Sequence, residues 1–125
     1  RTRAEGAFSL VLAESDAAHS RNTNVLAAID SILFTTHESS PRVPSPSVPS
    51  NRRCVVITGA ADSLIPSAWS DSTIVRSDAV FGAHEARGGM ALVVACRMIA
   101  QKRFDSILVL GAAPKRTYAA VLSCA

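Results

Sequence analysis

The stretch GGMALVVACRMIA (residues 88–100) constrains this chain most, because it is apolar almost all round when it is drawn as a helix. Arg97 is its single charged residue. A helix without a polar face has to be buried on both sides. A chain of 125 residues forms one domain with a modest core and could hardly cover such a helix alone. We therefore infer that much of its cover comes from another chain or from a missing half of the protein.

Apolar runs on either side of this helix predict strands. CVVIT (54–58) and SILVLGA (106–112) are typical of buried strands. After the turn PKRT, the run YAAVLSC (118–124) predicts the antiparallel return of a hairpin. GAFSLVLAE (6–14) predicts a further strand. Buried strands and an apolar helix together indicate the middle layers of an α/β protein.

Three remaining segments are less regular. NVLAAIDSILFTTH (24–37) has apolar residues at helical spacing but is also rich in β-formers, so helix and strand both stay open. SLIPSAWSDSTIV (63–75) contains the one tryptophan and predicts a short helix or an ordered loop. ESSPRVPSPSVPSNRR (38–53) holds four prolines and five serines, which predicts an extended, polyproline-like loop that forms no core.

Composition excludes several classes of function. Apolar residues make up 48% of the chain and charged residues 18%, which indicates a folded protein whose surface favours a partner. The net charge of +3 comes from scattered arginines and aromatic residues are 5%, so we expect no nucleic-acid surface. No apolar run is long enough to span a membrane. The three cysteines lack C-x-x-C spacing, which favours small buried hydrophobes in a reducing cytoplasm over a disulfide framework or a metal site.

Two Gly-Ala-Ala turns, at Gly59 and Gly111, each follow an apolar run and invite comparison with a phosphate-binding loop. A dinucleotide fingerprint needs three spaced glycines and a helix that follows at once. Here each turn supplies one glycine, and Pro66 or Pro114 interrupts the position of that helix. We predict no bound cofactor and interpret both turns as the ends of buried strands.

The order of three motifs resembles the C-terminal half of the β-ketoacyl synthases, in the thiolase superfamily. The motifs are EGAFSLVLAES (5–15), FGAHEARGGMALVVACRMIA (81–100) and SILVLGAAPKRTYAAVLSC (106–124). They are similar to the family's Glu-Gly-Ala strand, its Gly-His turn with a buried helix, and its terminal hairpin. The resemblance implies that residues 1–125 form one domain with part of a layered α-β-α arrangement, a mixed sheet and a buried central helix.

The chain departs from this family at the positions that carry its chemistry. The family's cysteine nucleophile lies upstream of the Glu-Gly-Ala strand and has no counterpart here. Its two histidines bind the carbonyl of the malonyl unit and promote loss of carbon dioxide. Gly59 stands where the first histidine turn is expected, and Ala83 follows Gly82 in place of the second histidine. His84 comes one residue late and is the only candidate catalytic residue.

Isolated polar residues show no site spacing. His19 and His37 lie in polar segments and form no ligand set with each other or with a cysteine. Asp62, Asp71 and Asp78 stand among small residues and could cap helices.

The resemblance therefore implies a degenerate, catalytically inactive subunit, similar to a chain length factor. Such a subunit would pair with an active ketosynthase, or with the missing N-terminal half, in fatty acid or polyketide chain elongation. We expect a cytoplasmic hetero-oligomer with acyl carrier protein as a further partner, and no metal, cofactor, nucleic acid or membrane.

Two alternatives stay open. In the first, the chain is part of an active ketosynthase that uses His84. In the second, it is a small α/β binding or regulatory module unrelated to ketosynthases, in which VPSPSVPS (43–50) is a docking loop for a proline-binding partner.

Overall fold

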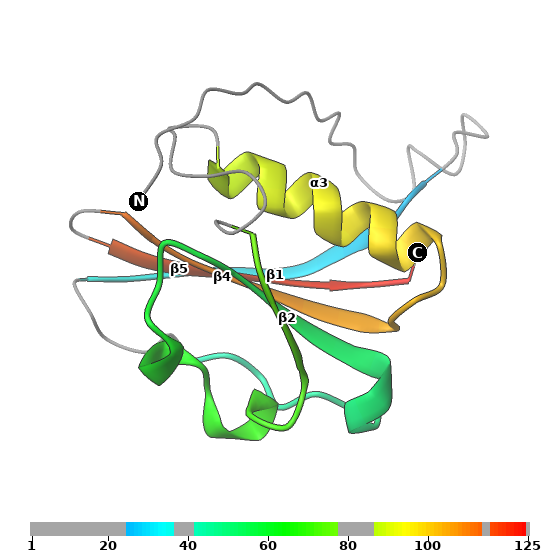
Figure 1. The fold of residues 1–125 in the computed structure, drawn as a ribbon, viewed down its shortest axis with the longest axis horizontal. Coiled ribbons are helices and arrows are strands. Elements are labelled where there is room, and N and C mark those ends of the chain that lie inside the picture. Colours follow the sequence, from blue (N-terminus) through cyan, green and yellow to red (C-terminus); the bar gives the residue numbers. More distant parts are fainter. Residues whose placement is uncertain (1–24, 37–41, 78–86, 114–115, 125) are drawn as a thin grey trace.

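The protein is a mixed α/β structure built on one five-stranded sheet, seen in a computed structural model that describes residues 25–36, 42–77, 87–113 and 116–124 (Figure 1). The strands are β1 (Ala28–Thr36), β2 (Arg53–Thr58), β3 (Thr73–Arg76), β4 (Ser106–Ala113) and β5 (Arg116–Ser123), and the helix is α3 (Arg87–Ala100). Short 3-10 helices span Ser50–Arg52, Asp62–Leu64 and Ser67–Trp69. The described part contains no helix long and apolar enough to cross a bilayer.

The strand order is β1-β5-β4-β2-β3. The central strand β4 pairs in parallel with β2 and antiparallel with β5, and β2 pairs in parallel with β3. The antiparallel partner of β5 on its other side is β1. The predicted strands at 54–58 and 106–112 and the antiparallel return are therefore confirmed. The two chain ends of the hairpin, Ala113 and Arg116, pair with each other, so only residues 114–115 join the strands instead of the predicted four.

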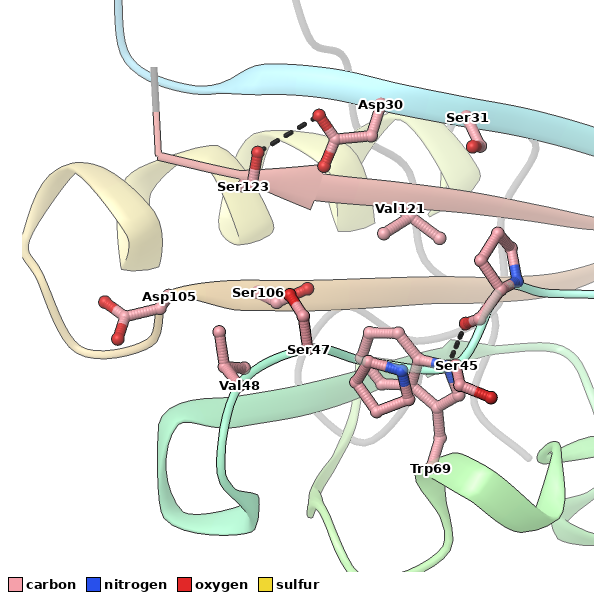
Figure 2. A pocket seen from close by; sticks show the side chains of 12 residues that line it. Asp30, Ser31, Ser45, Ser47, Val48, Trp69, Asp105, Ser106, Val121 and Ser123 are labelled. Carbon is pink, nitrogen blue, oxygen red and sulfur yellow. Dashed lines mark hydrogen bonds between the residues drawn. The ribbon is translucent and has the colours of Figure 1, made fainter.

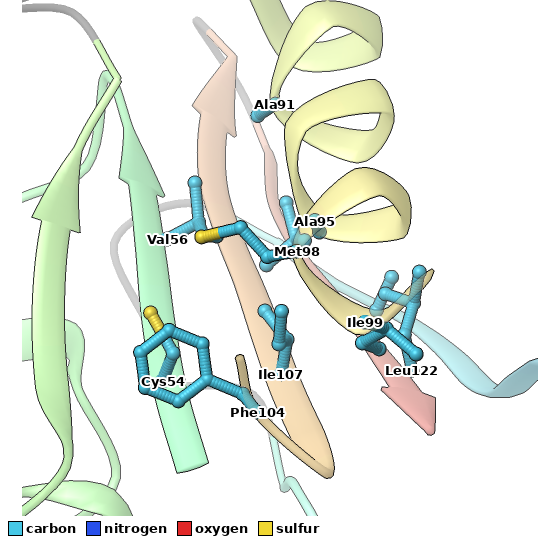
Figure 3. Close-up of a cluster of buried hydrophobic side chains, with 11 residues drawn as sticks. Cys54, Val56, Ala91, Ala95, Met98, Ile99, Phe104, Ile107 and Leu122 are labelled. Atoms are coloured by element: carbon cyan, nitrogen blue, oxygen red, sulfur yellow. The ribbon is translucent and has the colours of Figure 1, made fainter. Parts of the chain in front are cut away.

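The helix α3 covers one face of the sheet, where it packs on β2, β4 and β5 (Figure 3). Small side chains at Ala91 and Ala95 allow the helix backbone to come close to the strands, and Met98 and Ile99 fill the space nearer its end. These residues meet alternate side chains of the strands, because successive side chains of a strand point to opposite faces. The strand members of this α3-side cluster are Cys54, Val56, Ile107, Val109, Ala120 and Leu122.

Within the described ranges, no α-helix covers the second face of the sheet. Val55, Ile57, Leu108 and Leu110 point to this face and pack around Trp69, which is buried. The indole Nε1–H of Trp69 donates a hydrogen bond of 3.0 Å to the carbonyl of Pro44. The proline–serine segment, residues 42–49, thereby lies over this face together with the 3-10 helices, as Figure 1 shows below the sheet.

Three expectations about local structure need correction or completion. Residues 24–37 contain the strand β1, because Leu33 and its neighbours pair along the whole length of β5. Residues 63–75 contain the expected short helix, the 3-10 helix Ser67–Trp69, and also most of a strand that the pattern missed, β3, which pairs with β2. The proline–serine segment is indeed a loop, but it contributes Val43 to the core, which we had not expected.

The predicted layers are found only in part. Among the described residues one α-helix lies on one face of a mixed sheet, so a full α-β-α arrangement is not observed. The helix also is not buried all round: its sheet side is buried, whereas Arg97 and Ala100 are exposed. The described part of the chain therefore supplies cover for the sheet side of α3. The expected strand at 6–14 lies outside the described residues.

The helix ends in a Schellman turn around Lys102. The backbone N–H of Lys102 donates a hydrogen bond of 2.9 Å to the carbonyl of Ile99. The backbone N–H of Arg103 donates one of 3.0 Å to the carbonyl of Met98. Lys102 has a φ of 59°, the left-handed conformation in which glycine is favoured.

We expect Lys102→Gly to raise the free energy of unfolding by about 0.5–1 kcal/mol, because glycine relieves the strain of a side chain there. Urea unfolding would measure this, with Gln101→Gly as the control that should destabilise.

Gly111 lies inside β4 and does not end it, contrary to the sequence interpretation. A Cβ atom at this position would lie 2.1 Å from Cζ of Tyr118, the residue opposite it on β5. The glycine therefore leaves room for the tyrosine ring over the strand. The turn at Gly59 does follow the end of β2, and its φ of 66° explains the glycine.

We expect Gly111→Ala to destabilise the protein by about 1–3 kcal/mol, because the Tyr118 ring has to move. In the Tyr118→Ala background, where there is no ring to displace, Gly111→Ala should cost much less stability than it does in the parent protein. Urea unfolding of the four proteins measures the coupling. Additive effects of the two substitutions would contradict the close approach.

Candidate functional site

The catalytic candidate from sequence, His84, lies outside the described residues, as do His19, His37 and Asp78. Asp62 and Asp71 are described, and neither caps a helix. Asp62 pairs with Arg76, and Asp71 pairs with Arg53. The prediction of capping was wrong for these two because each carboxylate meets a guanidinium from a neighbouring strand.

The carboxyl ends of the parallel strands are where ligands often bind in α/β sheets, so their polar groups are of interest. Ser77 follows β3 and is buried. Its backbone N–H and its hydroxyl both donate to the carbonyl of Ile57, at 3.0 and 3.1 Å. Both donors thus tie the end of β3 to β2, and neither is available to a ligand.

The three cysteines are free thiols in different surroundings. Burial raises the pKa of the Cys54 thiol to about 11 and raises that of Cys96 as well. A thiol reacts as its thiolate, so both side chains are poor nucleophiles at neutral pH. Cys124 is exposed, and the expectation that all three cysteines are buried hydrophobes was wrong for this one. Cys54 and Cys96 therefore lack the properties of an acyl-transfer nucleophile.

Two adjacent arginines at the start of β2 hold distant segments together. Arg52 forms a bidentate ion pair with Asp105. Its Nε lies 3.1 Å from one carboxylate oxygen, and a terminal nitrogen lies 3.0 Å from the other. Its guanidinium also donates to the carbonyls of Lys102 and Arg103, at 3.0 and 3.2 Å. This clamp fastens the turn that ends α3. Sequence reasoning missed it, because Arg52 and its partners are far apart along the chain.

Arg53 performs the corresponding task on the second face. Its Nε donates to the Ser72 hydroxyl at 3.1 Å, and a terminal nitrogen donates to the carbonyl of Val48 at 2.8 Å. The other terminal nitrogen pairs with Asp71. The side chain thereby joins β2 to the proline–serine segment and to the turn before β3.

A small cavity of about 200 Å³ lies beneath the proline–serine segment (Figure 2). Its polar lining consists of hydroxyls from both sides of the cavity and two carboxylates, Asp30 and Asp105. Asp30 accepts a hydrogen bond of 3.1 Å from Ser123, and Asp105 is held by Arg52. Ligand pockets are commonly about 300–1,000 Å³, so this space is small for an organic substrate. Its lining contains no thiol and no imidazole.

The outward side of α3 forms a surface that we call the α3 outer stripe, defined by Met90, Val93, Arg97 and Ala100. These residues are three or four positions apart and therefore share one side of the helix. Met90 and Val93 are half-buried, and Arg97 is the stripe's single charge. Solvent-facing sides of helices normally carry several charged residues. The stripe is therefore unusually apolar for a helix side that faces away from its sheet.

The comparisons with known proteins give no relative: no protein family, no curated protein and no solved structure matches this chain.

The ion pairs of the two arginines predict a loss of stability in acid. Hydrogen bonds from Arg52 and Arg53 lower the pKa of Asp105 and of Asp71, respectively. A carboxyl whose pKa is lower in the folded state stabilises that state above its unfolded pKa of about 3.9, and the contribution disappears as the pH falls through the folded value. The free energy of unfolding should therefore fall below about pH 4.

Urea midpoints at a series of pH values would measure this dependence. Asp105→Asn should be less stable than the parent at neutral pH and should lose less stability on acidification, because the amide does not titrate. Asp71→Asn should behave in the same way. Parallel pH curves for the parent and both variants would contradict the assignment.

Proposed function

We propose that this chain is a non-catalytic ketosynthase-like subunit, similar to a chain length factor, that pairs with an active β-ketoacyl synthase in fatty acid or polyketide chain elongation. The observation that supports the pairing is the α3 outer stripe. With Met90 and Val93 apolar, this side of the helix carries one charged residue, Arg97, where water-facing helices carry several. A second thiolase-like subunit would cover the stripe, so that α3 would be a central helix buried between the sheet of this chain and the partner.

The chemistry of the stripe suits a lasting interface. Interfaces of permanent complexes are more apolar than transient ones and resemble a core divided between two chains. Ala100 allows close approach of a partner helix, and Arg97 has a long stem that can lie along apolar surface while its charge meets a partner carboxylate. In the proposed assembly, which works in the cytoplasm with acyl carrier protein, the partner supplies the nucleophile.

A non-catalytic role agrees with the thiols of the chain. Burial raises the pKa of Cys54 and of Cys96, so neither of these two thiols suits acyl transfer. The docking-loop alternative is less well supported. The proline–serine segment already contributes Val43 to the core and the Pro44 carbonyl to Trp69, so its conformation serves the fold.

Co-expression tests the proposal. With an active β-ketoacyl synthase of the same organism, the tagged chain should retain the synthase on an affinity column. Val93→Glu should reduce the retained synthase about tenfold, because it places a charge in an apolar interface. Gln101→Glu adds the same charge just beyond the helix and should leave retention unchanged.

Two results would contradict the proposal. One is a chain that is soluble, monomeric and cooperatively folded alone and retains no synthase. The other is equal retention of the synthase by the Val93→Glu and Gln101→Glu variants when both are soluble to the same extent.

A further inference from the structure

The strand β1 is an edge strand with few of the features that normally prevent edges from pairing. It has nine residues, and β5 is its only partner among the strands that the structure describes. Natural edge strands are commonly blunted by lysine, proline, bulges or inward-pointing charges. The register shifts between Ile29 and Ser31, which makes Asp30 the extra residue of a bulge. Beyond this bulge, Ser31–Thr35 contains no charge and no proline.

Exposed large hydrophobic side chains concentrate on the same segment. Those in the described part of the chain are Leu26, Ile29, Ile32 and Phe34. Ile32 is 56% exposed and Phe34 is 65% exposed. They lie opposite Ala120 and Tyr118 of β5, and Ala120 belongs to the α3-side cluster. Both side chains therefore extend the apolar face of the sheet beyond the strands that α3 covers.

We propose that β1 is a self-association edge, at which a second copy of this chain pairs antiparallel about a two-fold axis through Leu33. This proposal uses a surface separate from the α3 outer stripe and does not depend on the proposed function. The regular part of the strand is self-complementary. Centred on Leu33, the pairing sets Ile32 opposite Phe34 of the second copy, and the symmetry repeats this pair.

The registers centred on Ile32 and on Asp30 are less favourable. Aromatic and β-branched side chains in directly opposite positions stabilise a strand pair, and the Leu33 register provides two such pairs on the α3 side. On the other face of the sheet, the Leu33 register sets Ser31 opposite Thr35 of the second copy, and Leu33 opposite Leu33 of the second copy. A centre at Ile32 would set Asp30 opposite Phe34, and a centre at Asp30 would oppose two carboxylates. The second copy in the Leu33 register would continue the apolar row of Ile32 and Phe34 across the axis.

Cysteine cross-linking tests both the pairing and its register. Directly opposite residues of antiparallel strands have Cα atoms about 4.5 or 5.5 Å apart, and disulfides accept about 4.4–6.8 Å. In a Cys124→Ser background, which removes the exposed thiol, mild oxidation should link Leu33→Cys into a dimer. The pair Ile32→Cys with Phe34→Cys should link as well and leaves Leu33 in its place in the core.

The single variants Ile32→Cys and Phe34→Cys are the matched controls, because each new cysteine faces an unchanged residue of the second copy. The tagged chain is co-expressed with the synthase and is followed on non-reducing gels. The gels are run on cell lysate, so the chain does not have to be purified. We expect at least about tenfold more linked dimer from Leu33→Cys and from the pair than from the controls or the background.

The outcomes are clear-cut. Equal linking in all variants would show random collision and overturn the proposal, and so would stronger linking of a single variant, which requires another register. Links to a different protein, or none, would overturn it too. Because Val93→Glu tests the α3 outer stripe and these variants test β1, failure of one proposal can be told from failure of the other.

Discussion

Strands β2 and β4 are buried on both faces, and this constraint determines the rest of the described fold. Their side chains alternate between the α3-side cluster and the cluster around Trp69, so both faces need cover. One helix of 14 residues covers one of them. The other is covered by irregular chain, which has to satisfy its own backbone groups. The indole bond to the Pro44 carbonyl and the Arg53 bond to the Val48 carbonyl meet part of that demand.

The adjacent arginines of β2 connect these two covers to the same strand. Arg52 holds the turn after α3, and Arg53 holds the proline–serine segment. The connection made by Arg52 depends on the conformation of Lys102. A left-handed lysine and a Schellman turn place two carbonyls within reach of one guanidinium, so the helix terminus and the start of β2 depend on each other. Charge-assisted bonds of this geometry are among the stronger hydrogen bonds in proteins.

The sequence predicted the elements whose pattern is local. The helix α3 and the strands β2, β4 and β5 have apolar runs of the right length between turn residues. The strand β1 stayed ambiguous because Ile32 and Phe34 are apolar but exposed, and the alternation of a half-covered edge strand is not a core pattern. The four residues of β3 are too few for any period to show. Their strand conformation comes from pairing with β2, which is a tertiary effect.

The candidate surfaces were less predictable than the elements. The apolar character of 88–100 was visible in the sequence, but only the fold separates its buried side from the α3 outer stripe. The sequence alone does not show the roles of Arg52 and Arg53, because most of their hydrogen-bond partners are distant along the chain and meet them only in the fold. The one predicted catalytic residue, His84, lies outside the described part. Sequence reasoning thus reached the helix but not the exposure of one of its sides, and the ion pairs and the edge strand also required the structure.

The two proposed interfaces differ in the force that would make them specific. At the α3 outer stripe, burial of apolar area is non-directional, so specificity has to come from shape and from the partner that Arg97 meets. At β1 the backbone of the edge strand imposes direction and register, and side chains only select among registers two residues apart. The bulge at Asp30 limits that selection, because regular pairing cannot continue through it. An edge that is regular for six residues, from Ser31 to Thr36, and then interrupted favours a short, defined pairing over an open-ended stack of strands.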